Sequence, residues 1–183
     1  MIPGSWLRAE SAIVDSFGQF FTAGTMLQMK SYIVVTGVFL FAQVARAQIL
    51  EVSYQQKHES VALQEMTHTD FAAKGHDGVS HTFSCVPVST VLAKVQVPTG
   101  ENLRGAGMSL VLIASAKDNY HAAFALAEVD ESIGSKTVFV CDKQDGQPLS
   151  AADGPIRLVV PSDKRPARWV RMLTKLEIEP VQP

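Results

Sequence analysis

The pattern of polar and apolar residues predicts many short strands and a few helices. Polar and apolar positions alternate cleanly over 169–178, where Val170, Met172, Leu176 and Ile178 share one face, and weakly over 49–54. A period of two is typical of a half-buried strand. Leu110–Ala116 is a continuous apolar run, which predicts a strand buried on both faces. Further strands are predicted at 120–126, 137–141 and 156–160.

Turn and capping residues add a hairpin and two helices to this pattern. Segments 67–73 and 79–86 flank a loop with Gly75, Asp77 and Gly78, which supply the positive φ of a β-hairpin. Ser89 is placed to cap a helix that ends at Val95, and a helical turn is predicted at 127–131. The helix presents one apolar face, made by Val88, Val91, Leu92 and Val95. We therefore predict an α+β fold, a single compact domain of mixed β-sheet with short helices.

The first 47 residues differ in character from the rest of the chain. Met29-Lys30 opens a basic stretch, 32–42 is an uncharged run of 11 residues, and Ala45-Arg46-Ala47 offers small residues for cleavage. These are the three parts of a secretory signal, and the run is shorter than the ~20 apolar residues that span a bilayer. We predict a signal peptide at 29–47, cleavage after Ala47, and a periplasmic or secreted domain at 48–183. A buried N-terminal helix is the alternative.

Residues 1–28 fit neither the signal nor the domain. They carry Glu10 and Asp15, which do not suit the start of a signal peptide, and their apolar residues show no sustained period. We interpret them as a non-native N-terminal extension, with Met29 as the true start.

The charge of the chain is balanced overall and concentrated locally. The 183 residues contain 16 Lys+Arg and 18 Asp+Glu, a net charge of −2, which favours neither a nucleic-acid partner nor an anionic membrane surface. Within 157–171, however, five basic residues accompany one acidic residue, Asp163. The basic residues are Arg157, Lys164, Arg165, Arg168 and Arg171.

Three consecutive motifs carry a family resemblance. They are Asp145-Gly146-Gln147-Pro148-Leu149, the segment Gly154-Pro155-Ile156-Arg157-Leu158-Val159-Val160-Pro161, and the basic segment that ends in Arg168-Trp169. Over about 100 residues this order resembles the molybdopterin-binding domain of sulfite-oxidase-type oxidoreductases, which has a G-x-P-L turn, a G-P-x-R-x-x-V-P strand and a basic loop. The resemblance implies that family's fold and a site for its anionic pterin cofactor. The implied cofactor-binding residues are Arg165, Arg168, Lys164 and Arg157. A solvated turn is the alternative reading of this basic segment.

The chain departs from the family at the residue that matters most for redox chemistry. The full-length enzymes bind molybdenum through a cysteine upstream of an aromatic-x-G-V segment, which here corresponds to 83–86. No cysteine precedes Phe83, and Cys85 occupies the family's glycine position. We therefore expect a non-catalytic binding module for a pterin-type or other anionic ligand, or for an envelope protein. The alternative is a molybdenum-cofactor-dependent oxidoreductase, or a subunit of one.

Cysteine and histidine leave two smaller alternatives. Cys85 and Cys141 are the only cysteines and either form a disulfide or remain two buried thiols; we expect the thiols. His76, His81 and Cys85 form too loose a set for a zinc site, so we expect the histidines to be polar positions of the hairpin and predict no metal ligand.

Overall fold

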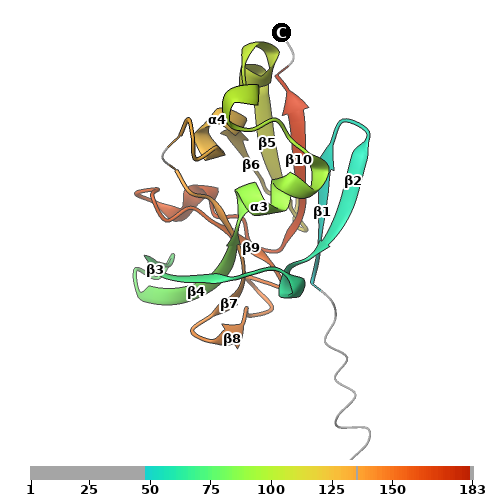
Figure 1. Ribbon diagram of the computed structural model, residues 1–183. Helices are drawn as coiled ribbons and strands as arrows, with labels where there is room; N and C mark the ends of the chain where they lie inside the picture. The colour runs from blue at the N-terminus through green and yellow to red at the C-terminus, as the bar shows by residue number, and fades with distance from the viewer. Residues whose placement is uncertain (1–47, 135, 182–183) are drawn as a thin grey trace, which may run out of the picture. The chain divides into compact units, whose positions relative to one another are not determined.

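Two β-sheets form the framework of the domain (Figure 1). The computed structural model of the protein describes residues 48–134 and 136–181; the predicted signal peptide and the extension before it lie outside these residues. The first sheet has the strand order β2-β1-β10-β5-β6, and the second has the order β3-β4-β7-β8, with β9 also pairing with β7. This arrangement, with short helices between strands, confirms the predicted α+β class.

The first sheet is mixed, because β1 and β10 run parallel while its other pairs are antiparallel. Its strands are β1 (Ile49–Tyr54), β2 (Lys57–Ala62), β5 (Leu110–Ala116), β6 (His121–Ala125) and β10 (Leu173–Pro180). The predicted apolar strand at Leu110–Ala116 is present, but only alternate residues are fully buried, from Leu110 and Leu112 onward. Its other face is half-buried, since a period-two pleat turns successive side chains to opposite faces.

The second sheet contains the predicted β3–β4 hairpin, but of the loop residues expected to have positive φ only Gly78 does, with φ of 77°. Its strands are β3 (Thr69–Lys74), β4 (Ser80–Pro87), β7 (Phe139–Gln144), β8 (Gln147–Pro148) and β9 (Arg157–Val159). The turn between β7 and β8 has φ of 52° at Asp145 and 75° at Gly146. Positive φ at both central residues matches the twist of a two-residue hairpin, which explains the Asp-Gly pair at this position.

The predicted helix is shorter than expected and has a different start. α3 covers Val88–Leu92 and continues as a 3₁₀ turn, η2 (Ala93–Val95), so the buried apolar face is confirmed. The predicted cap at Ser89 is wrong, because Pro87 occupies the N-cap position and no side chain caps the helix. Proline fixes φ and suits the beginning of a helix without a side-chain oxygen. The other short helices are η1 (Leu63–Glu65), η3 (Gly100–Asn102), η4 (Gly105–Ser109), α4 (Leu126–Val129) and η5 (Pro166–Arg168).

The last strand begins later than the alternation predicts. Met172 has φ of 49°, β10 begins at Leu173, and the register shifts between Leu173 and Lys175, so regular pairing starts only at Lys175. The buried positions are Val170, Leu173, Leu176 and Ile178, whereas Met172 is only half-buried. The prediction of Met172 on the core face is therefore wrong, because an irregularity of one residue moves the following side chains to the other face.

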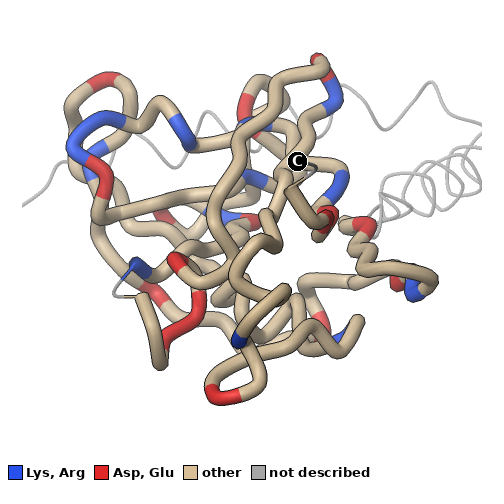
Figure 2. Tube along the Cα trace, turned by 90° about the horizontal axis from the view of Figure 1, so that it is seen from above, with Lys and Arg blue, Asp and Glu red and all other residues tan. Residues whose placement is uncertain are grey.

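Charge is spread over the whole domain. Figure 2 shows Lys and Arg interspersed with Asp and Glu along the described trace. Within that same part of the chain, no helix has the length and hydrophobicity needed to cross a bilayer.

Candidate anion-binding site

The predicted basic residues lie in and around the connection from β9 to β10, but their environments differ. Arg157 is in β9 and only 4% exposed, whereas Lys164 and Arg165 are exposed in the connection. Arg168 closes η5 and is half-buried. Closeness in sequence therefore does not make these four side chains one uniform basic surface.

Arg168 forms hydrogen bonds with two carboxylates. Its Nε and Nη2 donate to Asp163 at 2.8 and 2.7 Å, and its Nη1 donates to Glu128 at 3.2 Å. Lys136 donates to the same Glu128 oxygen at 2.9 Å, and the guanidinium carbon of Arg168 lies 4.6 Å from the Phe124 ring centre. Hydrogen bonds from Arg168 lower the pKa of Asp163, and those to Asp163 raise the pKa of Arg168. This network holds α4 and the basic loop together.

Arg157 is buried with much less compensation. Its Nη1 lies 3.4 Å from Asp153, and its guanidinium carbon lies 5.2 Å from the Trp169 ring centre and 5.9 Å from that of Phe83. Its Nε has no hydrogen-bond partner among residues 48–134 and 136–181. A buried donor without an acceptor costs free energy, so this atom favours an acceptor from a ligand.

Trp169 provides the wall on which Arg157 rests. The indole Nε1 donates to the carbonyl of Val160 at 3.0 Å, and the side chain is 5% exposed. Reciprocal backbone hydrogen bonds between Leu158 and Val170 tie the segment before β10 to β9. The aromatic ring and the strand therefore fix the position of the guanidinium.

A hollow of about 220 Å³ opens beside Arg157, and we call it the arginine cleft. Its lining includes His76, His81, Gln144, Asp153, Arg157 and Arg171. Arg171 is exposed and forms no ion pair within the described residues. A second hollow of similar volume shares His76 and Arg171 and adds Tyr120 and Trp169. The lining also contains two carboxylates, of which Asp77 hydrogen-bonds to His81 and Asp153 lies beside Arg157, so the two guanidinium groups are the part of the cleft that is suited to an oxyanion.

The two histidines of the hairpin have different charge preferences. Partial burial and the nearby charges of Arg157 and Arg171 lower the pKa of His76. His76 is therefore an uncharged imidazole at neutral pH. His81 lies between Asp77 and Asp145, at 3.0 and 2.7 Å, and these hydrogen bonds raise its pKa. His81 therefore links the β3–β4 loop to the β7–β8 turn, an arrangement we call the His81 bridge. The expectation that both histidines are polar positions of the hairpin agrees with this geometry.

The cysteines form a disulfide, so the expectation of two free thiols is wrong. Cys85 in β4 and Cys141 in β7 are directly opposed in the sheet, with an S–S distance of 1.97 Å and a Cα–Cα distance of 3.9 Å. The register of two strands distant in sequence creates this proximity. Neither sulfur is available as a thiolate, which is the form that binds a metal. The described residues also contain no cluster of three or more His, Cys, Asp or Glu side chains placed to hold a metal ion.

Comparison with known families agrees with this architecture. Residues 41–182 match the model of the oxidoreductase molybdopterin-binding domain, and the chain therefore belongs to that family. No curated protein matches the chain. The residues fit the two parts of a molybdenum cofactor unequally: arginines suit its anionic part, but both cysteines are joined and offer the metal no thiolate.

Sequence reasoning identified Arg157 but missed the residues that line the cleft with it. His76 was weighed as a metal ligand and expected to be a polar position of the hairpin, and Arg171 was read as part of a charge run. Gly75 and His76 of the β3–β4 loop line the arginine cleft together with Arg157 of β9, and no local pattern signals that contact. The Gly-Pro-x-Arg motif was the one useful signal, because it places an arginine in a strand that is otherwise entirely apolar.

Proposed function

We propose that this protein is an exported, non-catalytic member of the molybdopterin-binding family that binds an anionic ligand at the arginine cleft. The observation that carries the proposal is Arg157, which lines an open hollow and whose buried Nε has no partner among the described residues. Arg171 supplies a second guanidinium on the same hollow. Hydrogen bonds to charged groups contribute about 1.5–3 kcal/mol each, enough to give selective binding of a small anion.

The size of the cleft favours a small oxyanion or the phosphate end of a larger ligand. The volume of about 220 Å³ is below the ~300 Å³ at which pockets for whole drug-sized molecules begin. Continuity through His76 and Arg171 to the second hollow gives a longer ligand room to extend past Tyr120. A phosphate group in the arginine cleft with a flat ring beyond it is compatible with a pterin-type ligand.

This proposal gives different roles to the three arginines and one lysine that were expected to bind the cofactor. Arg157 contacts the anion directly. Lys164 and Arg165 are exposed and attract the anion from solvent. Arg168 fixes the shape of the loop through Asp163 and Glu128.

Export is supported by the disulfide. Disulfides persist in oxidising compartments such as the periplasm and are rare in the cytosol. The bond between Cys85 and Cys141 is therefore compatible with the predicted signal peptide at 29–47. Intact mass of the exported form tests this part: we expect a chain that begins at Gln48, and a retained 1–28 segment contradicts it.

Calorimetric titration with sulfate tests the anion site, because sulfate keeps its charge between pH 5 and 8. We expect one site per chain, lost on Arg157→Gln. An unchanged affinity in that variant removes the proposal.

A molybdenum-cofactor oxidoreductase is the second candidate, and membership of the family favours it. Metal analysis of protein purified from its native envelope separates the two. Stoichiometric molybdenum supports the oxidoreductase, and a metal-free protein that binds sulfate supports the binding module.

A further inference from the structure

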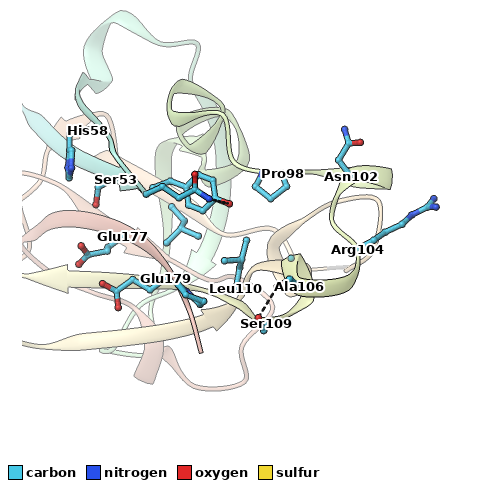
Figure 3. A pocket seen from close by; sticks show the side chains of 15 residues that line it. Ser53, His58, Pro98, Asn102, Arg104, Ala106, Ser109, Leu110, Glu177 and Glu179 are labelled. Atoms are coloured by element: carbon cyan, nitrogen blue, oxygen red, sulfur yellow. Dashed lines mark hydrogen bonds between the residues drawn. The ribbon is translucent and has the colours of Figure 1, made fainter. Parts of the chain in front are cut away.

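A larger cavity lies at the opposite end of β10 from the arginine cleft (Figure 3). Its volume is about 600 Å³, and it is lined by the ends of β1 and β10 and by the loop 98–109. Arg171 precedes β10 and Glu179 lies near its end, so at ~3.3 Å per residue they are roughly 26 Å apart along the strand. A small ligand in one site cannot contact the other.

The wall of this cavity contains a buried hydroxyl without a partner. Ser53 is 5% exposed, and its Oγ forms no hydrogen bond within the described part of the chain. In the sheet, Ser53 stands opposite His58 of β2 and Glu177 of β10. Residues paired across strands direct their side chains to the same face, and all three line the cavity. A ligand with a hydrogen-bonding group would give the hydroxyl of Ser53 the partner that it lacks.

The charge at this end of the cavity is negative. Figure 3 shows Glu177 and Glu179 on the same side as Ser53, with Arg104 on the far side. Lys175 donates to one oxygen of Glu177 at 2.7 Å, and Glu179 forms no ion pair in the part of the chain that is described. Arg104 is exposed and 4.0 Å from Glu101. Carboxylates accept several hydrogen bonds, so this wall is suited to a group with several donors.

The rest of the lining is partly apolar, and its apolar residues are Pro98, Ala106, Leu110 and Ile178. Ile178 lies between Glu177 and Glu179 in β10, so these apolar residues meet the polar row at the end of the sheet rather than across it. The volume falls in the range of about 300–1,000 Å³ that holds small organic ligands. We propose that this cavity binds a primary ammonium group carried on a short apolar body, with the ammonium against Ser53, Glu177 and Glu179.

Titration of the full chain with hexylammonium and with hexanoate tests the proposal, because the two probes share a chain and differ in charge. We expect hexylammonium to bind with a stoichiometry of one and hexanoate to bind at least about tenfold more weakly. In NMR spectra, backbone signals of Ser53, Ser109 and Glu179 should move. Equal binding of the two probes overturns the proposal, and stronger binding of hexanoate assigns the cavity to Arg104 instead.

Two variants and one control complete the experiment. Glu179→Gln and Ser53→Ala should each weaken hexylammonium binding by roughly fivefold or more. Ser53→Ala should leave the melting temperature unchanged or higher, since it removes a buried hydroxyl that lacks a partner. Glu65→Gln, an exposed carboxylate outside the cavity, should have no effect. Undiminished binding in Glu179→Gln, or equal losses in all three variants, overturns the proposal.

Discussion

Arg157 and Arg168 belong to one basic segment, yet they are placed in opposite electrostatic situations. Arg168 directs three nitrogens to Asp163 and Glu128, and its charge is used within the fold. Arg157 is more deeply buried but has only Asp153 at 3.4 Å and an Nε without a partner among the described residues. The comparison shows that burial and pairing, and not the density of basic residues, decide which charge is available to a ligand.

Trp169→Ala should have the largest effect, because Trp169 supports the Arg157 side of this comparison. Deleting a buried aromatic costs ~3–5 kcal/mol of unfolding free energy. Chemical denaturation measures this loss. Sulfate affinity should fall as well, since the guanidinium loses the ring on which it packs. Tyr120→Phe is the control, and a stability loss as small in Trp169→Ala as in this control contradicts the packing role.

Exchanging the two arginines for glutamine separates the roles directly. Arg157→Gln should weaken sulfate binding at least about tenfold, because hydrogen bonds to charged groups are worth ~1.5–3 kcal/mol each. Arg168→Gln should leave sulfate affinity within about twofold and lower stability by ~1–2 kcal/mol, the usual scale for a few half-exposed ion pairs. Calorimetry and denaturation measure the two effects. The comparison breaks down if the two variants lose affinity equally.

The pH dependence of binding should sharpen the comparison through His76. The groups that face His76 are Arg157, Arg171, Asp153 and Asp77, and its pKa is lowered in the free protein. A bound anion favours the imidazolium, so sulfate affinity should rise by roughly threefold or more from pH 7.5 to pH 5.5. His76→Gln should make sulfate affinity much less dependent on pH. An equally steep profile in both proteins assigns the effect to another group.

The His81 bridge predicts a different pH dependence, that of stability. The folded pKa of His81 lies above its usual value of 6.5, so the bridge contributes fully below about pH 6.5. Its contribution is lost as pH rises through the raised pKa. The melting temperatures of the parent and His81→Gln should therefore converge between pH 6 and pH 9. A constant difference indicates that packing, not charge, stabilises this contact.

The smallest effect is expected for Lys164→Gln and Arg165→Gln. Both side chains are exposed, and water and salt screen their charges. Stability should change by less than about 0.5 kcal/mol and sulfate affinity by less than about twofold at 0.15 M salt. If either variant lost more sulfate affinity than Arg157→Gln, the anion site would lie in the exposed loop, as the basic sequence motif alone suggests.

Local patterns predicted the hairpin and most of the strands, because these depend on neighbouring residues. β2 (Lys57–Ala62) was not predicted, since its sequence is mostly polar and has no clear period. Leu110–Ala116 and the Asp145-Gly146 turn are examples, and the buried face of α3 follows the same rule. The start of β10 was missed, because Met172 adopts a positive φ that its residue type does not indicate. The irregularity also moved the core face from Met172 to Leu173.

The site was less predictable, because it depends on contacts between distant segments. The pairing of Cys85 with Cys141 required the register of β4 and β7. The neutralisation of Arg168 required Glu128 from α4, 40 residues away in the chain. His76 of the β3–β4 loop and Arg157 of β9 line the same cleft although they lie far apart in the sequence. Neither the residue types nor the spacing of the motifs indicates any of these three contacts.

Anomalous diffraction from crystals that contain selenate, a heavier analogue of sulfate, locates a bound anion without relying on any variant. The account predicts a selenium peak in the arginine cleft, within hydrogen-bonding distance of the Nε of Arg157 and next to Arg171. A peak at Lys164 and Arg165 with an empty cleft, or no peak when sulfate binding is saturated in solution, would contradict it.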